Sequence, residues 1–213
     1  MAVHKKPVPR ALLRARAAPR CPAMDAIELL LTRASQGKLR EPAPDDAALE
    51  RAFAAALRAP DHGLLRPWRF QLIRGDARAR FGALMREELR RRKPHASDEE
   101  LEKQSRKPLR APLLIVVSAR VQVDHPKVPA IEQMLSAAAA AQNILLALHA
   151  QGYAGMWRTG DAAYDPQIKR ALGLAPNDAI IGFLYTGTAA LPAPEVARPR
   201  ADAHVEEWRE PLA

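Results

Sequence analysis

Apolar residues recur at helical spacing in five stretches of the chain, and residues that cap or break helices bound most of them. Asp25 stands before the first stretch and can accept hydrogen bonds from the free backbone N–H groups there. Pro60 ends the second, because the residue before a proline avoids the helical region. Pro166 suits the first turn of the last. The pattern predicts helices over residues 25–37, 47–59, 76–89, 129–151 and 165–172.

Four other stretches have the patterns of β-strands. In residues 67–74, successive side chains are expected on opposite faces of a strand, with Trp68, Phe70 and Leu72 on the same face. Residues 113–118 run apolar without interruption, as expected of a buried central strand. Helices and strands interleave unevenly and no internal repeat is present, so the pattern indicates the α+β class, with a sheet wrapped by helices. The predicted strands are 67–74, 113–118, 153–159 and 179–188.

The segment 76–110 differs from its surroundings because it is strongly charged. It holds 11 basic and 7 acidic side chains and few apolar ones after the helix that begins at Asp76. Ser97 and Glu100 form a capping box that opens a short charged helix. We favour a solvated, mobile excursion over the surface, and the alternative is a lid over a binding site.

Length and composition fit one globular domain. The chain has 213 residues, of which 48% are hydrophobic, too large a fraction for a disordered protein. A single cysteine, Cys21, excludes an intramolecular disulfide and a cysteine-based metal site. No apolar run approaches the ~18 residues of a membrane helix, so we expect no membrane span. Alanines at 137–141 permit the close approach of a second helix, in this chain or across a dimer.

The formal net charge of +9 is concentrated at the N-terminus. Residues 1–23 hold six basic side chains and no acidic one, so the rest of the chain carries only +3. This composition is typical of an organelle transit peptide or of an arm that binds nucleic acid. Patterned sequence begins only at Met24, so we favour a disordered leader, or a start codon annotated too far upstream. The folded domain is then 24–190, followed by a proline-rich, extended tail over 191–213.

The residues that could carry chemistry form three polar clusters, each at the end of a predicted element. The common motifs for dinucleotides, ATP, zinc peptidases and serine hydrolases are absent, and the histidines lack metal-ligand spacing, so no metal is expected. In Arg33–Ser35, a guanidinium and a hydroxyl can grip a phosphate. The other clusters are Arg58–His62 and Trp157–Gly160. Taken singly, such clusters are structural more often than functional.

In order and spacing, these clusters resemble the FMN-dependent nitroreductase superfamily, and most of all its short bacterial NAD(P)H nitroreductases. The resemblance runs from Met24 to Thr188 and includes neither the leader nor most of the tail. No single piece is decisive, but the ordered set is specific. It consists of MDAIELLLTRAS at 24–35, EPAP at 41–44, RAPDH at 58–62, PWRF at 67–70, RAPL at 110–113, KVP at 127–129, AQGYAGMWRTG at 150–160 and GFLYTGT at 182–188.

The resemblance implies an FMN site shared by two chains. One departure from the family pattern is Ala34, which replaces an arginine, while Lys38 stands in for a second; this would lower the affinity for phosphate. The segment that the resemblance assigns to the nicotinamide nucleotide also has the pattern of the end of a packed helix; it comprises Ala147, Leu148, His149, Ala150, Gln151 and Gly152. The residues implied to contact FMN are Arg33, Ala34, Ser35, Trp157, Arg158 and Thr159, with Arg58 and His62 from the neighbouring subunit.

The fold and activity implied by the resemblance are those of a homodimeric flavoenzyme with a mostly antiparallel sheet wrapped by helices. NADH or NADPH would reduce FMN, leave, and be replaced by a nitroaromatic, a quinone or a similar acceptor in a ping-pong cycle, with no catalytic side chain. The alternatives are a flavin reductase for another small acceptor, such as an enone or a short aldehyde, and a flavin-binding or nucleic-acid-associated protein without turnover. We expect a cytoplasmic protein with neither a membrane nor a nucleic-acid partner.

Overall fold

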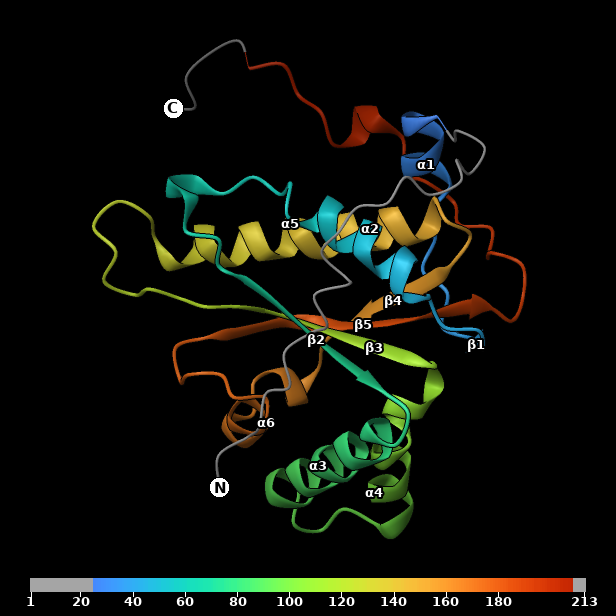
Figure 1. Ribbon diagram of the computed structural model, residues 1–213, viewed down its shortest axis with the longest axis vertical. Coiled ribbons are helices and arrows are strands. Elements are labelled where there is room, and N and C mark those ends of the chain that lie inside the picture. The colour runs from blue at the N-terminus through green and yellow to red at the C-terminus, as the bar shows by residue number, and fades with distance from the viewer. Residues whose placement is uncertain (1–24, 209–213) are drawn as a thin grey trace.

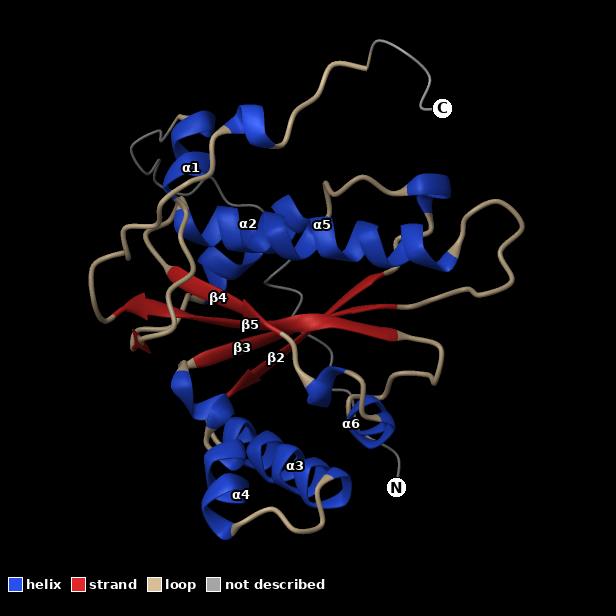
Figure 2. Ribbon diagram, turned by 180° about the vertical axis from the view of Figure 1, so that it is seen from behind, coloured by secondary structure: helices blue, strands red, loops and turns tan. Residues whose placement is uncertain are grey.

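The computed structural model describes residues 25–208, which form six α-helices and five β-strands in three layers. The predicted leader, Cys21 and Met24 lie outside the described residues, as do residues 209–213. Figure 1 shows the sheet between two layers of helices, and Figure 2 shows the same layers from behind. One layer holds α2 (Asp46–Ala56) and α5 (Ala130–His149), and α1 (Ala26–Thr32) lies outside it near α5; the other holds α3 (Ala77–Arg92), α4 (Asp98–Ser105) and α6 (Pro166–Ala171).

The sheet is antiparallel throughout, which confirms the predicted architecture. The strand order is β1-β5-β3-β2, and β4 also pairs with β5. Residues 183–187 of β5 pair with β4 and residues 188–189 pair with β1, so β4 and β1 follow one another along β5. The strands are β1 (Leu39–Arg40), β2 (Trp68–Arg74), β3 (Leu113–Ala119), β4 (Ala154–Arg158) and β5 (Ala179–Ala189).

Two hydrophobic cores hold the layers together, one on each face of the sheet. The alternation predicted for residues 67–74 is present in β2, where Trp68, Phe70 and Leu72 pack in the core against α2 and α5. Ile73 packs in the opposite core, beneath α3 and α6. Every residue of β3 is buried, because helices cover both of its faces. The prediction of a buried central strand is therefore confirmed.

Helix α5 approaches α2 closely through its alanines. Ala137, Ala140 and Ala141 are fully buried in the same core as residues of α2. Nδ2 of Asn143 donates a hydrogen bond to the Ala55 carbonyl oxygen of α2 at 3.1 Å. The sequence predicted that these alanines allow close packing of a second helix, either in this chain or across a dimer. The structure shows the packing within this chain.

Helix α5 also corrects the statement that no segment is long and apolar enough to cross a membrane. Its 20 residues reach a mean hydropathy of 1.2 in an 18-residue window, which meets that criterion by length and composition alone. Core helices of globular domains meet it too, and α5 packs against α2 and the sheet along its length. Its hydropathy therefore reflects a position beside α2 and over the sheet.

The charged segment 76–110 is a packed helical hairpin, so the prediction of a mobile excursion is wrong. The capping box of Ser97 and Glu100 is present and opens α4. Phe81 and Met85 of α3 are buried against the sheet, at a spacing of one helical turn. Gly82 lies against the Ser105 backbone so closely that a Cβ atom would overlap it. The hairpin covers one half of a sheet face, and all of its charged side chains except that of Glu88 are exposed or half-buried.

The helix α1 is shorter than its pattern predicts. It begins at the predicted cap, Asp25, whose carboxylate accepts two backbone hydrogen bonds. It ends at Thr32 and not near Gly37, and the chain then runs extended beside β4. There the Gln36 N–H donates to the Gly155 carbonyl oxygen at 3.1 Å. This tertiary hydrogen bond replaces the last predicted helical turn.

Other boundaries differ by a few residues for local reasons. α2 ends at Ala56 and not at Ala59, because the turn before Pro60 tightens into i→i+3 hydrogen bonds. The two-residue strand β1 was not predicted, since two residues carry no alternation. In the tail, residues 191–200 have neither helix nor strand, as expected, and a short 3-10 helix follows at Ala201–Ala203.

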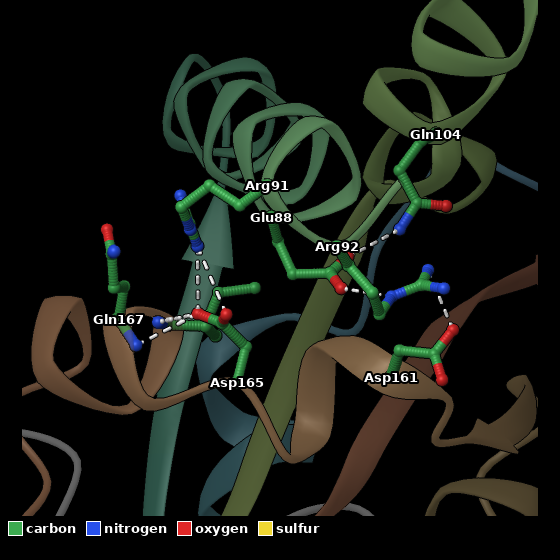
Figure 3. Close-up of polar contacts among 8 residues, drawn as sticks. Glu88, Arg91, Arg92, Gln104, Asp161, Asp165 and Gln167 are labelled. Atoms are coloured by element: carbon green, nitrogen blue, oxygen red, sulfur yellow. Dashed lines mark hydrogen bonds and ion pairs between the residues drawn. The ribbon is translucent and has the colours of Figure 1, made fainter. Parts of the chain in front are cut away.

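The hairpin is bound to the chain after β4 by ion pairs that start from a buried carboxylate. Glu88 of α3 is only 1% exposed, and its Oε1 accepts from Arg92 Nε at 2.7 Å. Nη2 of Arg92 lies 2.8 Å from Asp161 Oδ2, and Arg91 pairs with Asp165 at 3.1 Å (Figure 3). Arg92 therefore compensates a buried charge and also joins two segments.

Arg92→Gln should lower the free energy of unfolding by about 1.5 kcal/mol, because it leaves the buried Glu88 carboxylate without its cation; the loss is smaller than for a fully buried pair, since the Arg92 side chain is 46% exposed. The matched control is Arg90→Gln on the same helix, which breaks a solvent-exposed pair with Glu87 and should cost at most about 0.5 kcal/mol. Urea unfolding of the two variants measures the difference. Equal losses would show that Glu88 does not depend on Arg92.

Candidate functional site

A pocket of about 410 Å³ opens where β4 meets the α3–α4 hairpin. One wall is the end of β4 and the turn after it, residues 157–162. The opposite wall comes from Gln104 of α4 and from Lys107 and Arg110 in the 3-10 helix η3 (Lys107–Arg110). Its size lies within the range of small-molecule sites. The structure thus joins one predicted cluster, Trp157–Gly160, to the charged segment 76–110, for which the sequence analysis favoured a surface excursion over a lid.

Strand β4 directs two consecutive side chains to opposite faces of the sheet. Trp157 packs against the core beneath α5, and its indole Nε1 donates to the Ile181 carbonyl oxygen at 3.2 Å. Gly182 is required beneath it, because a Cβ there would overlap the indole ring. The Arg158 guanidinium lies on the other face, 6.0 Å from the centre of the Tyr185 ring. This alternation aims Arg158 at the hairpin side, where it lines the pocket.

The loop after α1 passes close to Met156 and Arg158. A Cβ on Gly37 would lie 3.3 Å from Met156 Cε and 3.5 Å from Arg158 Nη2. Gly160, which follows Thr159, has φ +94°, a conformation that L side chains rarely adopt. Glycine at these two positions therefore lets the backbone pass close to Arg158 and turn sharply at the rim.

The hairpin wall of the pocket is cationic. Burial is the main cause that lowers the pKa of Lys107, and the neighbouring Arg110 lowers it further, whereas Asp161 and Glu88 oppose the shift. With Arg158 on the facing wall, three cations and one carboxylate, that of Asp161, line the pocket. The arrangement suits a ligand that carries negative charge or accepts hydrogen bonds along one edge.

Arg33, the first residue of the phosphate-type cluster, lies on the α5 side of the sheet. With Ala34 it lines a small hollow beside His149 and Tyr153. Ser35 is exposed on the loop that leads on to Gly37. Arg198 of the tail donates from Nη2 to the Arg33 carbonyl oxygen at 3.0 Å. The loop 33–38 therefore brings together Arg33, the tail arginine and, at its far end, Arg158.

His62 lies at the other end of α5. His62 Nδ1 is 2.6 Å from Glu132 Oε2, in the first turn of α5, whereas Arg33 lies beside His149, in its last turn. Glu132 and His149 are 17 residues apart, about 25 Å along a helix axis. One protomer therefore does not bring His62 to Arg33. Arg58 follows α2, whose Ala55 carbonyl oxygen accepts from Asn143 in the middle of α5.

The segment assigned to the nicotinamide nucleotide, Ala147–Gly152, is the end of α5 and the turn after it. Leu148 is buried in the core, and the Gln151 amide donates to the Ala48 carbonyl oxygen at 3.3 Å and accepts from Arg51 Nε at 2.6 Å. Gly152 ends the helix with φ +82°. These contacts dock α5 on α2, and a role in nucleotide binding stays a prediction.

The sequence analysis named none of the wall residues Gln104, Lys107 and Arg110 as site residues, nor the tail residue Arg198, although it considered 76–110 as a lid over a binding site. The spacing of Phe81 and Met85 was a further local signal, since it marks α3 as a helix with one buried face. Nothing local places these polar residues beside Trp157–Gly160, since more than 45 positions separate them. Within residues 25–208 no group of three or more His, Cys, Asp or Glu side chains could hold a metal.

Comparison with known proteins shows where this architecture recurs. The family model described as "Nitroreductase family" matches residues 30–188. The Escherichia coli K12 protein named "Putative NAD(P)H nitroreductase YdjA" is 41% identical over 170 residues, which are 80% of this chain and 91% of that protein. Among solved structures, a nitroreductase-like family protein from Bacillus cereus superposes with a TM-score of 0.73 at 22% identity, covering 90% of this chain and all of its own. A Bacteroides fragilis nitroreductase with bound FMN gives 0.65 at 19%, covering 88% and 100%.

The pKa of His149 is lowered by burial and then by the charge of Arg33, which predicts a pH-dependent stability. The neutral form is favoured in the folded chain, so this stability is present above the unfolded pKa of about 6.5 and is lost as the pH falls toward the lower folded value. Between about pH 7.5 and pH 5, the melting temperature should fall less in His149→Gln than in the unmodified protein. His204→Gln, at an exposed histidine, is the control and should leave the pH dependence unchanged. Parallel melting curves for His149→Gln and the unmodified protein would contradict the assignment.

Proposed function

The chain belongs to the nitroreductase family, and we propose that it is a homodimeric, cytoplasmic, FMN-dependent oxidoreductase that uses NADH or NADPH to reduce nitroaromatics, quinones or similar small acceptors. The observation that carries the proposal is the 410 Å³ pocket, in which Trp157–Thr159 face Gln104 and Lys107. The name of the Escherichia coli relative and the FMN bound to the Bacteroides fragilis protein support the same activity.

The donors of the pocket fit the polar edge of a flavin. The isoalloxazine ring is flat, and one edge carries two carbonyl groups that accept hydrogen bonds. Lys107 and Arg158 offer donors from facing walls, and Tyr185 supplies flat apolar surface. When bound, FMN would supply the redox chemistry by accepting a hydride from the nicotinamide and passing electrons to the acceptor. The chain's own part is to hold the ring, keep cations at its polar edge and admit flat acceptors.

The phosphate of FMN fits the loop after α1. It carries about −1.5 to −2 charges and takes up several hydrogen bonds. Arg33 and Arg198 bring two guanidinium groups to this loop, and Ser35 adds an exposed hydroxyl donor. Because the loop continues to Gly37 beside Arg158, a ligand with its phosphate at one end of the loop can place its ring in the pocket. Arg198 thereby makes up for the arginine that Ala34 replaces.

The protomer by itself leaves apolar surface uncovered. Helix α1 has no buried residue, and Ile27, Leu30 and Leu31 on it are each more than half exposed. A second group of exposed apolar side chains surrounds the His62–Glu132 pair: Leu57, Leu64, Ile131 and Leu135. Surface of this kind is typical of subunit contacts. A second copy of the chain that covers it would also bring Arg58 and His62 to the partner's pocket, which one chain does not do.

The competing function is a flavin-binding protein without turnover, or a reductase for an enone or a short aldehyde. The purified protein should be yellow or become so with FMN, and NADH or NADPH should bleach it under anaerobic conditions. Reoxidation by a panel of nitroaromatics, quinones, enones and aldehydes identifies the acceptor class. A colourless protein that takes up no FMN would refute the enzyme and the binding protein alike.

Arg33→Ala should weaken FMN binding by about 1.5–3 kcal/mol, the scale of a charged hydrogen bond. Arg80→Ala, at an exposed residue of α3, removes the same charge elsewhere on the surface and serves as the control. Quenching of FMN fluorescence on titration with each variant gives the dissociation constants. An affinity equal to that of the Arg80→Ala control would remove Arg33 from the site.

A shared site predicts that two defective chains repair one another. A heterodimer of Arg33→Ala and His62→Ala chains contains one site with both natural residues and one site with neither. Mixed subunits carrying different affinity tags should therefore recover about one wild-type site per heterodimer, as measured by FMN titration and turnover. If both sites of the purified heterodimer stay defective, Arg33 and His62 do not serve the same cofactor.

A further inference from the structure

A buried carboxylate stands directly behind the polar wall of the pocket. Glu88 of α3 is 1% exposed, and the proposed function gives it no role. It lies between two pocket residues: Gln104 is 3.5 Å from its Oε2, and Asp161 is reached from its Oε1 through Arg92 (Figure 3). A charge in such a position is costly to bury, so its contacts deserve a functional explanation.

The first contact orients Gln104. This residue is 7% exposed and lines the pocket. Its amide nitrogen faces the Glu88 carboxylate, which attracts the NH₂ end and repels the carbonyl end. The carbonyl end therefore remains for the pocket, and a flavin has a single N–H donor between its two ring carbonyls. A neutral residue at position 88 would no longer distinguish the two ends of the amide.

The second contact fixes the rim of the pocket. Arg92 joins Glu88 at 2.7 Å to Asp161 at 2.8 Å, and Asp161 follows Gly160 at the end of the β4 wall. The neighbouring Arg91 makes a comparable pair with Asp165 at 3.1 Å, but neither of these residues lines the pocket. Arg92 therefore makes an ion pair with a residue of the pocket, whereas the ion pair of Arg91 lies outside the pocket.

The charge of Glu88 also faces the cations of the hairpin wall. The carboxylates of Glu88 and Asp161 raise the pKa of Lys107, whereas the guanidinium groups of Arg110 and Arg92 lower it. FMN gains negative charge when it is reduced, so cations in the wall favour the reduced form and a carboxylate behind the wall favours the oxidised form. Glu88 therefore limits how strongly the pocket prefers the reduced cofactor.

From these contacts we infer that Glu88 is a positioning residue of the flavin pocket, which orients Gln104, holds Asp161 through Arg92, and sets the preference of the site between oxidised and reduced FMN. The inference rests on the proposed function, since it assumes FMN in this pocket. It concerns residues that contact no substrate, and it predicts a property of the bound cofactor that packing alone would not change.

The test compares Glu88→Gln with Arg91→Gln in the full-length, FMN-loaded protein. The first keeps the shape of the side chain and removes its charge; the second breaks the Arg91–Asp165 pair next to it. The affinity for oxidised FMN and the midpoint potential of the bound flavin are measured for each. In Glu88→Gln the ratio of reduced to oxidised affinity should rise about tenfold, which for a two-electron couple is a potential about 30 mV more positive. Arg91→Gln should leave the ratio unchanged.

A second variant keeps the test decisive if Glu88→Gln does not fold. Glu88→Gln/Arg92→Gln removes the buried pair as a whole, an exchange that proteins often tolerate. Its ratio should still differ from that of Arg91→Gln, because Gln104 and Asp161 have lost their partners. If either variant has the wild-type ratio of reduced to oxidised FMN affinity, the role of Glu88 is overturned. The same holds if Arg91→Gln changes this ratio as much as Glu88→Gln does. Failure of the wild-type protein to bind FMN would instead refute the proposed function.

Discussion

The burial of β3 on both faces is the constraint on which the rest of the structure depends. Every side chain of Leu113–Ala119 is covered, so neither face of the sheet can be left to solvent. The α2–α5 layer covers one face, and the α3–α4 hairpin with α6 covers the other. Both layers are needed to shield β3 from solvent. For this reason the segment 76–110 forms packed helices in spite of its many charges.

The pocket lies where the second of these layers ends. β4 is a short strand that pairs only with β5 in the described sheet, and the hairpin stops beside its last residues. Polar groups gather at such an edge because backbone and side chains there stay accessible, while apolar residues continue into the core. Trp157 and Arg158 show this division within two residues, one held in the core and the other turned to the pocket.

Charge is distributed in the protein according to burial. The cations that line the pocket are partly exposed, whereas the carboxylate behind them is covered and is held by Arg92. The ion pairs of Arg92 stabilise the hairpin and also hold Asp161 at the pocket. The same residues therefore contribute to the stability of the fold and to the geometry of the proposed cofactor site. At the other end of α5, apolar side chains such as Ile131 and Leu135 remain exposed in the protomer near the His62–Glu132 pair.

Local pattern was sufficient for the four longer strands and for the α+β class, because alternation in β2 and the apolar run of β3 directly reflect burial on one face or on both. It also located the caps at Asp25 and Ser97, since capping depends on neighbouring residues. Ordered motifs indicated the family and the candidate residues Arg33, Arg58 and Arg158.

Tertiary structure decided what depends on residues far apart in sequence. The Gln36–Gly155 hydrogen bond ended α1 early, and packing under α3 turned a charged segment into the wall that holds Gln104 and Lys107. It also set His62 about 25 Å along α5 from Arg33, a separation that no local pattern contains. The sequence thus determined which residues are available for chemistry, and the long-range contacts determined which of them meet.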